Sequence, residues 1–276
     1  MSTLFKSVLG AFAAVFATIT AFAATVVTTE ADLKTALAAG GEVALGADIQ
    51  LSEALNATAD ISLDLSGYTL TAGSDGMAIN SENGKSVTIK DSGKNGEIKG
   101  IINNGNPSTM IIEGGIYTSL DTYVFWNTGT MTINGGVVNG KGSYPLYSYN
   151  AGHKLTINDV IVNGECGCLN AYGKGEVIVN GGTFNYAGRE GYTYHIVYVS
   201  NDTKMTINGG SFQKVGEVDL SAEGGGGICG AGTSELIING GSFSGAYTDV
   251  TDYSASNVIT INGGTFINLF GGVDAV

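Results

Sequence analysis

A four-residue motif, Ile-Asn-Gly-Gly, recurs along the chain and constrains the fold more than any other feature of the sequence. Complete copies occupy residues 133–136, 207–210, 238–241 and 261–264, with variants at 112–115, 157–159 and 179–182. Each copy ends a run of β-forming residues, and a large apolar residue usually follows two positions after the second glycine. Because one strand–turn–strand corner is repeated, the sequence predicts a solenoid.

The spacing of the motif predicts the type of solenoid. Weaker corners can be traced upstream through Ile89, Leu65 and Leu45, so ten anchors cover the 216 residues from Leu45 to Ile261 in nine steps of 24 on average. About this many residues form one coil of a single-stranded parallel β-helix, which rises about 4.8 Å per coil. The expected fold is therefore all-β, with about ten coils and a length of about 48 Å.

The strand before each corner has an alternating pattern. Residues one and three positions before the corner Asn are apolar, and the residue between them is Thr or Ile. This two-residue period predicts one buried face and one outer face of β-branched side chains. The anchors that we expect to stack in one inward column are Ile133, Ile157, Val179, Ile207, Ile238 and Ile261.

The corner asparagines have a structural interpretation. A short amide side chain tolerates left-handed backbone and can hydrogen-bond to the coils on either side, so we expect an internal amide ladder. The two glycines that follow would supply positive φ angles. The phosphate-loop sequence G-x-x-x-x-G-K-[ST] does not occur. The expected ladder consists of Asn134, Asn158, Asn180, Asn208, Asn239 and Asn262.

Composition limits the domain organisation and the partners. Glycine makes up 44 of 276 residues and proline only 2, which favours one turn-rich domain, residues 24–276, over a low-complexity linker. The net charge is −13 and Arg189 is the single arginine. Nucleic acids and acidic polysaccharides both need a basic surface, so neither is an expected partner.

Residues 1–23 are expected to be a signal peptide or a hydrophobic anchor. Lys6 precedes an apolar stretch, and Ala21-Phe22-Ala23 matches the small-x-small pattern of a signal-peptidase site. Cleavage before Ala24 and export are therefore the expectation. The alternatives are an uncleaved membrane anchor and a helix packed in a larger assembly.

The two ends of the solenoid differ. Thr29-Glu30-Ala31-Asp32 is a capping box that predicts a helix at about residues 29–39, closing the first coil. The last coil instead continues as Phe266-Ile267-Asn268-Leu269-Phe270, with no comparable cap. Since solenoids need polar caps to stay soluble, we expect this apolar end to dock on another subunit, either a second copy or a different chain.

Three segments together resemble a known superfamily. They are the helix-capped entry ADLKTALAAGGEVALGADIQL, the segment LDLSGYTLT that follows it, and the tandem coils of the type TINGG-x-F. Over about residues 25–270 the chain is similar to the right-handed parallel β-helix proteins of the pectate-lyase-like superfamily, particularly non-catalytic members in bacterial surface proteins and in phage fibres and tailspikes. The resemblance implies a right-handed coil and specifies no activity.

The catalytic groups of the superfamily's enzymes are not apparent in the sequence. Those enzymes cut polysaccharides with clustered aspartates and a catalytic Arg, Lys or His, whereas His153 and His195 stand apart here and are interpreted as surface polar groups. We therefore predict no cofactor and no cleavage of acidic glycans. Asp249 and Asp252 are weak candidates for a calcium site, and a solvated loop is the preferred interpretation.

The cysteines indicate no catalytic or metal site, whereas the aromatic residues suggest a binding surface. Cys166, Cys168 and Cys229 are expected to be free thiols, because the count is odd and Cys168 and Cys229 fall two coils apart, roughly 10 Å and beyond disulfide reach. C-x-C without further ligands is poor support for zinc. Outward aromatic rings on a rigid sheet can stack on sugars or bury against a partner chain, although scattered surface aromatics are the alternative. The candidates for this column are Trp126, Tyr147, Tyr149, Tyr172 and Tyr198.

These observations favour a non-enzymatic structural or recognition β-helix, exported or displayed at the cell surface. Its expected role is adhesion, or binding of a neutral glycan or a partner protein. The first alternative is a phage virion component, such as a head fibre or tailspike-like subunit. The second is a polysaccharide lyase or hydrolase.

Overall fold

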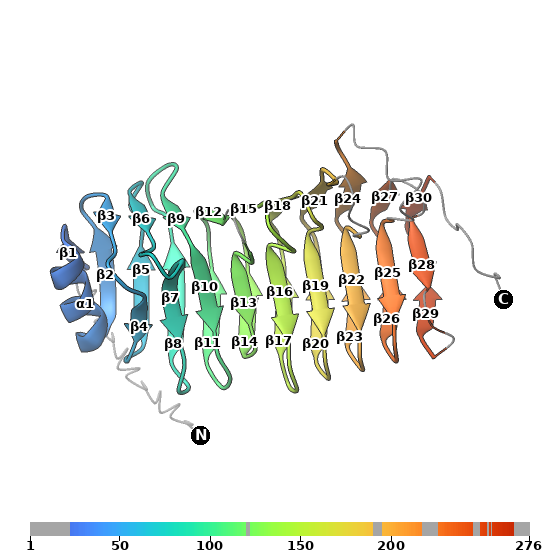
Figure 1. The fold of residues 1–276 in the computed structure, drawn as a ribbon, viewed down its shortest axis with the longest axis horizontal. Helices are drawn as coiled ribbons and strands as arrows, with labels where there is room; N and C mark the ends of the chain where they lie inside the picture. Colours follow the sequence, from blue (N-terminus) through green and yellow to red (C-terminus); the bar gives the residue numbers. More distant parts are fainter. Residues whose placement is uncertain are drawn as a thin grey trace, which may run out of the picture.

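The computed structural model is an elongated solenoid of three parallel sheets (Figure 1). It describes residues 23–119, 122–189, 195–216, 226–244, 249–252, 254 and 256–267. Within these residues, nine three-strand coils run from β2–β4 to β26–β28, and β29 and β30 begin a tenth. Each coil contributes one strand to each sheet, and every paired strand is parallel to its neighbour in the next coil, which fits a parallel β-helix.

In the described part of the chain, the three sheets have 11, 10 and 9 strands and are called sheets A, B and C. Sheet A contains β1 (Thr25–Val27), β2 (Gly41–Leu45), β5 (Ile61–Asp64), β8 (Ser86–Lys90), β11 (Thr109–Ile112), β14 (Thr130–Ile133), β17 (Lys154–Ile157), β20 (Glu176–Val179), β23 (Lys204–Ile207), β26 (Glu235–Ile238) and β29 (Val258–Ile261). Sheet B contains β3 (Ile49–Gln50), β6 (Thr69–Thr71), β9 (Glu97–Lys99), β12 (Ile116–Ser119), β15 (Val137–Gly140), β18 (Ile161–Gly164), β21 (Thr183–Tyr186), β24 (Ser211–Lys214), β27 (Ser242–Ser244) and β30 (Thr265–Phe266). Sheet C contains β4 (Leu55–Ala57), β7 (Met77–Ser81), β10 (Ile101–Asn104), β13 (Phe125–Asn127), β16 (Leu146–Tyr149), β19 (Leu169–Tyr172), β22 (Val197–Ser200), β25 (Ile228–Ala231) and β28 (Val250–Asp252).

The inward column of anchors on sheet A is confirmed. The anchors from Ile133 to Ile261 are residue-for-residue partners in successive strands, and all except Ile261 are fully buried. Of the upstream anchors, Ile89 is in register with Ile112, whereas Leu65 and Leu45 are two residues too late. Ile89 pairs with Leu63, and Leu63 pairs with Val43. Leu65 and Leu45 are also buried, so alternation alone cannot distinguish these two registers.

The large apolar residues after each corner form a second inward column, on sheet B. Its C-terminal half is a stack of four phenylalanine rings that are nearly parallel. The successive ring centroids of Phe184, Phe212, Phe243 and Phe266 lie 4.6, 5.0 and 4.7 Å apart. Stacking one ring per coil lets identical residues fill the core at the coil spacing.

Sheet C buries a row of polar side chains beside its apolar column. Asn104 Nδ2 donates to Asn127 Oδ1 at 2.8 Å, and Asn127 Nδ2 donates to Ser148 Oγ at 2.9 Å. Ser148 Oγ is hydrogen-bonded to His153 Nδ1 at 2.8 Å, and all four residues are buried. The interpretation of His153 as a surface group was therefore wrong, since this row gives it a buried hydrogen-bond partner, and burial lowers its pKa.

The corner asparagines do form a ladder, but on the outside of the solenoid. From Asn158 onward, each side-chain amide donates to the Asn Oδ1 of the preceding coil at 2.7–2.8 Å, and Asn134 Nδ2 donates to Glu113 Oε1 at 3.1 Å. The expected internal position was wrong, because five of the six asparagines are exposed and Asn134 is half-buried. None of them has a positive φ, which is confined to the second glycine, as in Gly182 at 106°.

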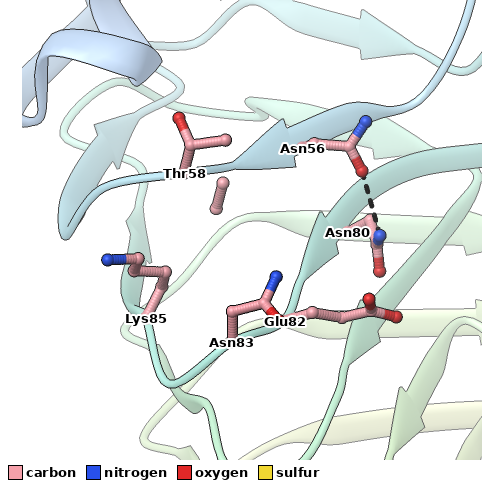
Figure 2. Close-up of a pocket in the computed structure, with 7 residues that line it drawn as sticks. Asn56, Thr58, Asn80, Glu82, Asn83 and Lys85 are labelled. Atoms are coloured by element: carbon pink, nitrogen blue, oxygen red, sulfur yellow. Dashed lines mark hydrogen bonds between the residues drawn. The ribbon is translucent and has the colours of Figure 1, made fainter.

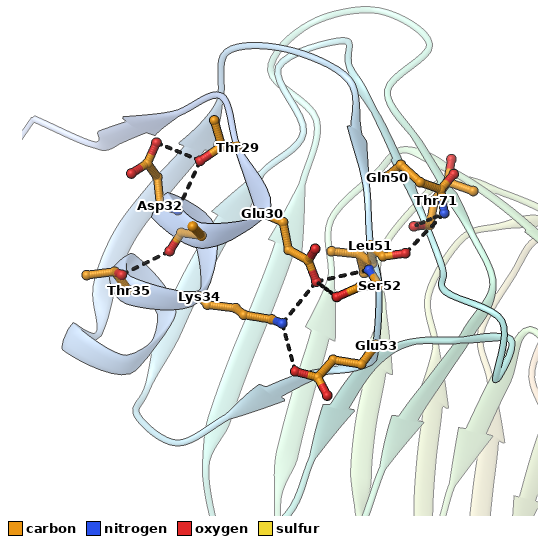
Figure 3. Close-up of polar contacts among 11 residues, drawn as sticks. Thr29, Glu30, Asp32, Lys34, Thr35, Gln50, Leu51, Ser52, Glu53 and Thr71 are labelled. Carbon is orange, nitrogen blue, oxygen red and sulfur yellow. Dashed lines mark hydrogen bonds and ion pairs between the residues drawn. The ribbon is translucent and has the colours of Figure 1, made fainter.

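Helix α1 (Glu30–Ala39) lies over the N-terminal coil, where the capping box places it, and contacts β1, β2 and β4 (Figure 1). The Thr29 hydroxyl accepts from the Asp32 amide at 3.2 Å. Glu30 accepts hydrogen bonds from the Ser52 amide and hydroxyl at 3.0 and 2.8 Å, and Lys34 contacts it at 3.0 Å (Figure 3). The Ser52 amide, followed by Lys34, lowers the pKa of Glu30 to about 2. These contacts fix the helix over the core that it covers.

The segment expected to be a signal peptide or anchor spans residues 1–23, and residues 1–22 of it lie outside the described residues. Among the residues that are described, no helix is both long enough and apolar enough to cross a membrane.

Candidate functional site

The outer face of sheet C carries a column that changes from amides to aromatic rings along the solenoid. Asn56, Asn80 and Asn103 occupy this column in β4, β7 and β10, and Trp126 and Tyr147 follow in β13 and β16. Asn80 Nδ2 donates to Asn56 Oδ1 at 2.9 Å, and Asn103 Nδ2 donates to Asn80 Oδ1 at 2.7 Å. An amide ladder therefore ends one strand before the first aromatic ring.

Four aromatic side chains are in contact at this position and are called the four-ring cluster: Tyr123, Trp126, Tyr147 and Tyr149. Tyr123 stacks on Tyr147 with ring centroids 4.3 Å apart and meets Trp126 edge-on at 5.5 Å. Tyr149 lies 5.6 Å from Trp126 and 5.3 Å from Tyr147. All four residues are half-buried, so the cluster presents ring surface to solvent while its members hold one another in place.

The other two predicted aromatics extend the face without joining the cluster. The register places Tyr149 beside Tyr172, whereas Tyr147 is followed by Asn170 and then Tyr198. The five candidates therefore lie in two columns rather than one. Tyr172 is 43% exposed, and Tyr198 stacks on His195 at 6.1 Å.

Tyr123 was missed because it precedes β13. Strand alternation around the inward Phe125 would also place residue 123 inward, but Tyr123 belongs to the turn before the strand, where alternation does not apply. Its ring lies over the outer face and completes the cluster. A tyrosine two residues before an aromatic strand is the only local signal.

Two phenol groups on this face, those of Tyr147 and Tyr198, have raised pKa values and stay protonated at neutral pH. Burial raises the pKa of Tyr147, and the neighbouring Tyr123, Tyr149 and Tyr172 raise it further. Burial, followed by Cys229, raises the pKa of Tyr198. Neutral phenols can both donate and accept hydrogen bonds, which suits an uncharged polar ligand.

A shallow pocket lies at the amide end of the column (Figure 2). It has a volume of about 280 Å³ and is lined by Asn56, Ala57, Thr58, Asn80, Glu82, Asn83 and Lys85. The Asn56 and Asn80 side chains are joined across β4 and β7 by the hydrogen bond of the ladder. Polar groups thus continue the outer face away from the four-ring cluster.

His195 is buried, so its interpretation as a surface group was wrong. Its Nδ1 accepts from the Gly226 amide at 3.2 Å, and its own amide donates to the Tyr144 hydroxyl at 3.2 Å. Burial lowers the pKa of His195 to about 4. Its imidazole therefore contacts backbone groups of the fold.

The aspartates considered for calcium have separate protein partners. Asp249 is buried and its Oδ2 accepts from the Ile267 amide at 2.6 Å, while Asp252 Oδ1 accepts from Asn257 Nδ2 at 2.6 Å. The solvated-loop interpretation was wrong for Asp249, and Asp252 ends strand β28. Within the described part of the chain, no group of three or more His, Cys, Asp or Glu side chains could hold a metal ion.

The three cysteines are free and buried, as expected for the thiols. Burial raises the pKa of Cys168, and it raises the pKa of Cys229 to about 12. Cys166 Sγ lies 3.9 Å from an Arg189 guanidinium nitrogen. Protonated, buried thiols at Cys168 and Cys229 are poor nucleophiles and poor metal ligands.

Comparison with protein-family models, with curated proteins and with solved structures found no match for this chain. The outer face of sheet C offers aromatic rings for stacking, and amide and phenol groups for hydrogen bonding.

Proposed function

We propose that this protein is a non-enzymatic recognition β-helix, exported or displayed, that binds a neutral glycan along the outer face of sheet C. The four-ring cluster next to the amide ladder carries the proposal. Sugar rings present apolar faces that stack on aromatic rings, and hydroxyl edges that bond to amides. The net charge of −13 disfavours acidic glycans.

Comparing glycan binding by the wild type and by the Trp126→Ala variant tests this function. Each stacked ring contributes about 1 kcal/mol, so removing the indole should weaken binding about fivefold. Tyr68→Ala is the matched control, because Tyr68 is 37% exposed but lies next to β6 of sheet B. A glycan array would identify a neutral ligand, and calorimetry would compare the variants. Equal binding by wild type and Trp126→Ala, or no binding by either, excludes the carbohydrate role.

We also propose that the solenoid is right-handed and related to the pectate-lyase-like β-helices. Parallel strands of one sheet that are joined by a crossover connection are right-handed in about 98% of cases. The three parallel sheets and the helix over the N-terminal coil support this assignment. An experimental structure with left-handed coils would contradict it.

Export predicts a processed N-terminus. The small-x-small triplet Ala21-Phe22-Ala23, within an uncharged stretch, supports cleavage before Ala24. Mass spectrometry of the native protein should then find a mature chain that begins at or near Ala24. An intact Met1 or Ser2 on assembled material would favour the membrane-anchored or virion alternative.

A second candidate function, assembly into a larger structure such as a phage fibre, is favoured by the exposure of apolar side chains at β29 and β30, the last strands of the described residues. Ile259, Ile261 and Phe266 are only partly buried, whereas their partners one coil earlier, Leu236, Ile238 and Phe243, are 0–2% exposed. Docking of another subunit on this end would cover these side chains. Replacing Ile261 by Asp should then disrupt an assembly that native mass measurement detects, and an unchanged mass would argue against it.

A further inference from the structure

The outer face of sheet A is a regular surface over six strands, β14, β17, β20, β23, β26 and β29. These strands pair residue for residue without a register shift. A central column of β-branched side chains is flanked on one side by the asparagine ladder and on the other by a column that contains four charged residues. The central column consists of Thr132, Thr156, Ile178, Thr206, Ile237 and Thr260.

The charges in the flanking column alternate in sign along the solenoid. Lys154, Glu176, Lys204 and Glu235 occupy it in β17, β20, β23 and β26. Lys204 and Glu235 form an ion pair at 3.2 Å within the chain, with side chains 48% and 43% exposed. The four charges therefore remain accessible to a second molecule.

We propose that a second copy of this chain packs face to face on sheet A, with the two solenoids antiparallel. A two-fold axis along the strand direction, between β20 and β23, reverses the order of the strands and leaves each column opposite itself. Lys154 then faces Glu235 of the second copy, and Glu176 faces its Lys204. All four charges on each copy meet the opposite sign.

The same axis also matches the other two columns. It sets the β-branched column against itself and the asparagine ladder against itself, over the six strands that carry the Asn residues. An axis along the solenoid would instead place the charged column opposite the asparagines and leave the four charges without counter-charges. Charge complementarity thus selects the antiparallel arrangement.

The area indicates how strong this association should be. Six strands spaced about 4.8 Å apart, with a face about 17 Å wide, cover roughly 490 Å² per copy. Two copies would bury roughly 1,000 Å², which is at the low end for a specific interface. The dimer is therefore weak and reversible, and its assembly requires high protein concentration and low salt.

Sedimentation velocity of the full chain, as a function of protein and salt concentration, tests the proposal. Lys154→Glu and Glu235→Lys should each weaken dimerisation by roughly tenfold or more, because each replaces two attractive contacts across the axis with two repulsive ones. Both sites are on the surface, and thermal unfolding should show that both variants remain folded.

Mixing the two single variants provides the decisive measurement. In a heterodimer the introduced carboxylate faces the introduced ammonium group and the two original charges face each other, so dimers should reappear. The double variant Lys154→Glu/Glu235→Lys should dimerise for the same reason, although it places like charges next to each other within each sheet.

Three outcomes overturn the proposal. If the alternating charges serve only to stabilise the sheet of one chain, mixing the two single variants restores no dimers, and the double variant is only less stable to unfolding than the wild type. A wild-type protein that is monomeric at all concentrations excludes the dimer. A wild-type dimer that neither substitution changes uses another surface, such as the C-terminal coil.

Discussion

Replacing the first glycine of three corners by alanine, at Gly114, Gly135 and Gly181, should give a graded series of stabilities. An added Cβ would meet nothing within 4 Å at Gly114, but would lie 3.2 Å from the Glu113 carbonyl oxygen at Gly135, and 2.8 Å from the Asn158 carbonyl oxygen at Gly181. None of these three glycines has a positive φ, so backbone strain does not contribute to the differences. The distance from the added Cβ to the nearest carbonyl oxygen therefore distinguishes the three sites.

The magnitudes follow from two opposing effects. Alanine restricts the unfolded chain and thereby stabilises by about 0.4–1 kcal/mol where the site has room, which is the expectation for Gly114→Ala. Overpacking against a rigid backbone atom costs about 1–3 kcal/mol, so Gly181→Ala should be destabilised by about 1–2 kcal/mol net. Gly135→Ala should lie near zero, because its contact is tight but longer.

Urea unfolding followed by circular dichroism would measure the series, with an unchanged m value as the check that only stability has changed. The carbonyl that the added Cβ of Gly181→Ala would approach belongs to Asn158, an asparagine of the external ladder. Gly181→Ala should therefore also increase amide hydrogen exchange in the adjoining coils. Equal effects at Gly114, Gly135 and Gly181, or a larger loss at Gly114 than at Gly181, would refute the argument from coil-to-coil contact.

Three further predictions concern the ladder of corner asparagines, the buried His195 and the phenylalanine stack of the core. Asn180→Ala removes two hydrogen bonds, those to Asn158 and from Asn208, and should lower the free energy of unfolding by about 1–2 kcal/mol in urea titrations. An unchanged free energy of unfolding would mean that water replaces these hydrogen bonds. Burial lowers the pKa of His195 from 6.5 to about 4, so as the pH falls the unfolded chain binds a proton before the folded chain does. The stability that neutral His195 contributes is fully present above pH 6.5 and should be lost as the pH falls through about 4. His195→Asn should flatten this pH dependence, and an unchanged profile would contradict the assignment. Phe212→Ala should cost about 3–5 kcal/mol, and Phe266→Ala on the partly buried end less, as measured by thermal and urea unfolding; equal losses would contradict the difference in burial.

The sequence determined the coil architecture because its signals are local. Alternating apolar residues before each corner specify an inward face, and a repeat of nearly constant length brings equivalent residues together in neighbouring coils. The anchors from Ile133 to Ile261 and the residues of helix α1 could therefore be predicted. The aromatic candidates were predicted as outward residues for the same reason.

Only the tertiary structure decided the features that depend on contacts between coils. Tyr123 joins the four-ring cluster from a turn, His153 and His195 are buried by neighbouring coils, and the Asn ladder lies outside the core. The partners involved are often about 20 to 30 residues apart, as for Asn158 and Asn180 at a separation of 22. Alternation fixes which side of a strand a residue occupies, but turns lack this period and coil register depends on loop length. Whether a polar side chain lies inside or outside, and which ring it meets, is therefore set by the stacking of the coils.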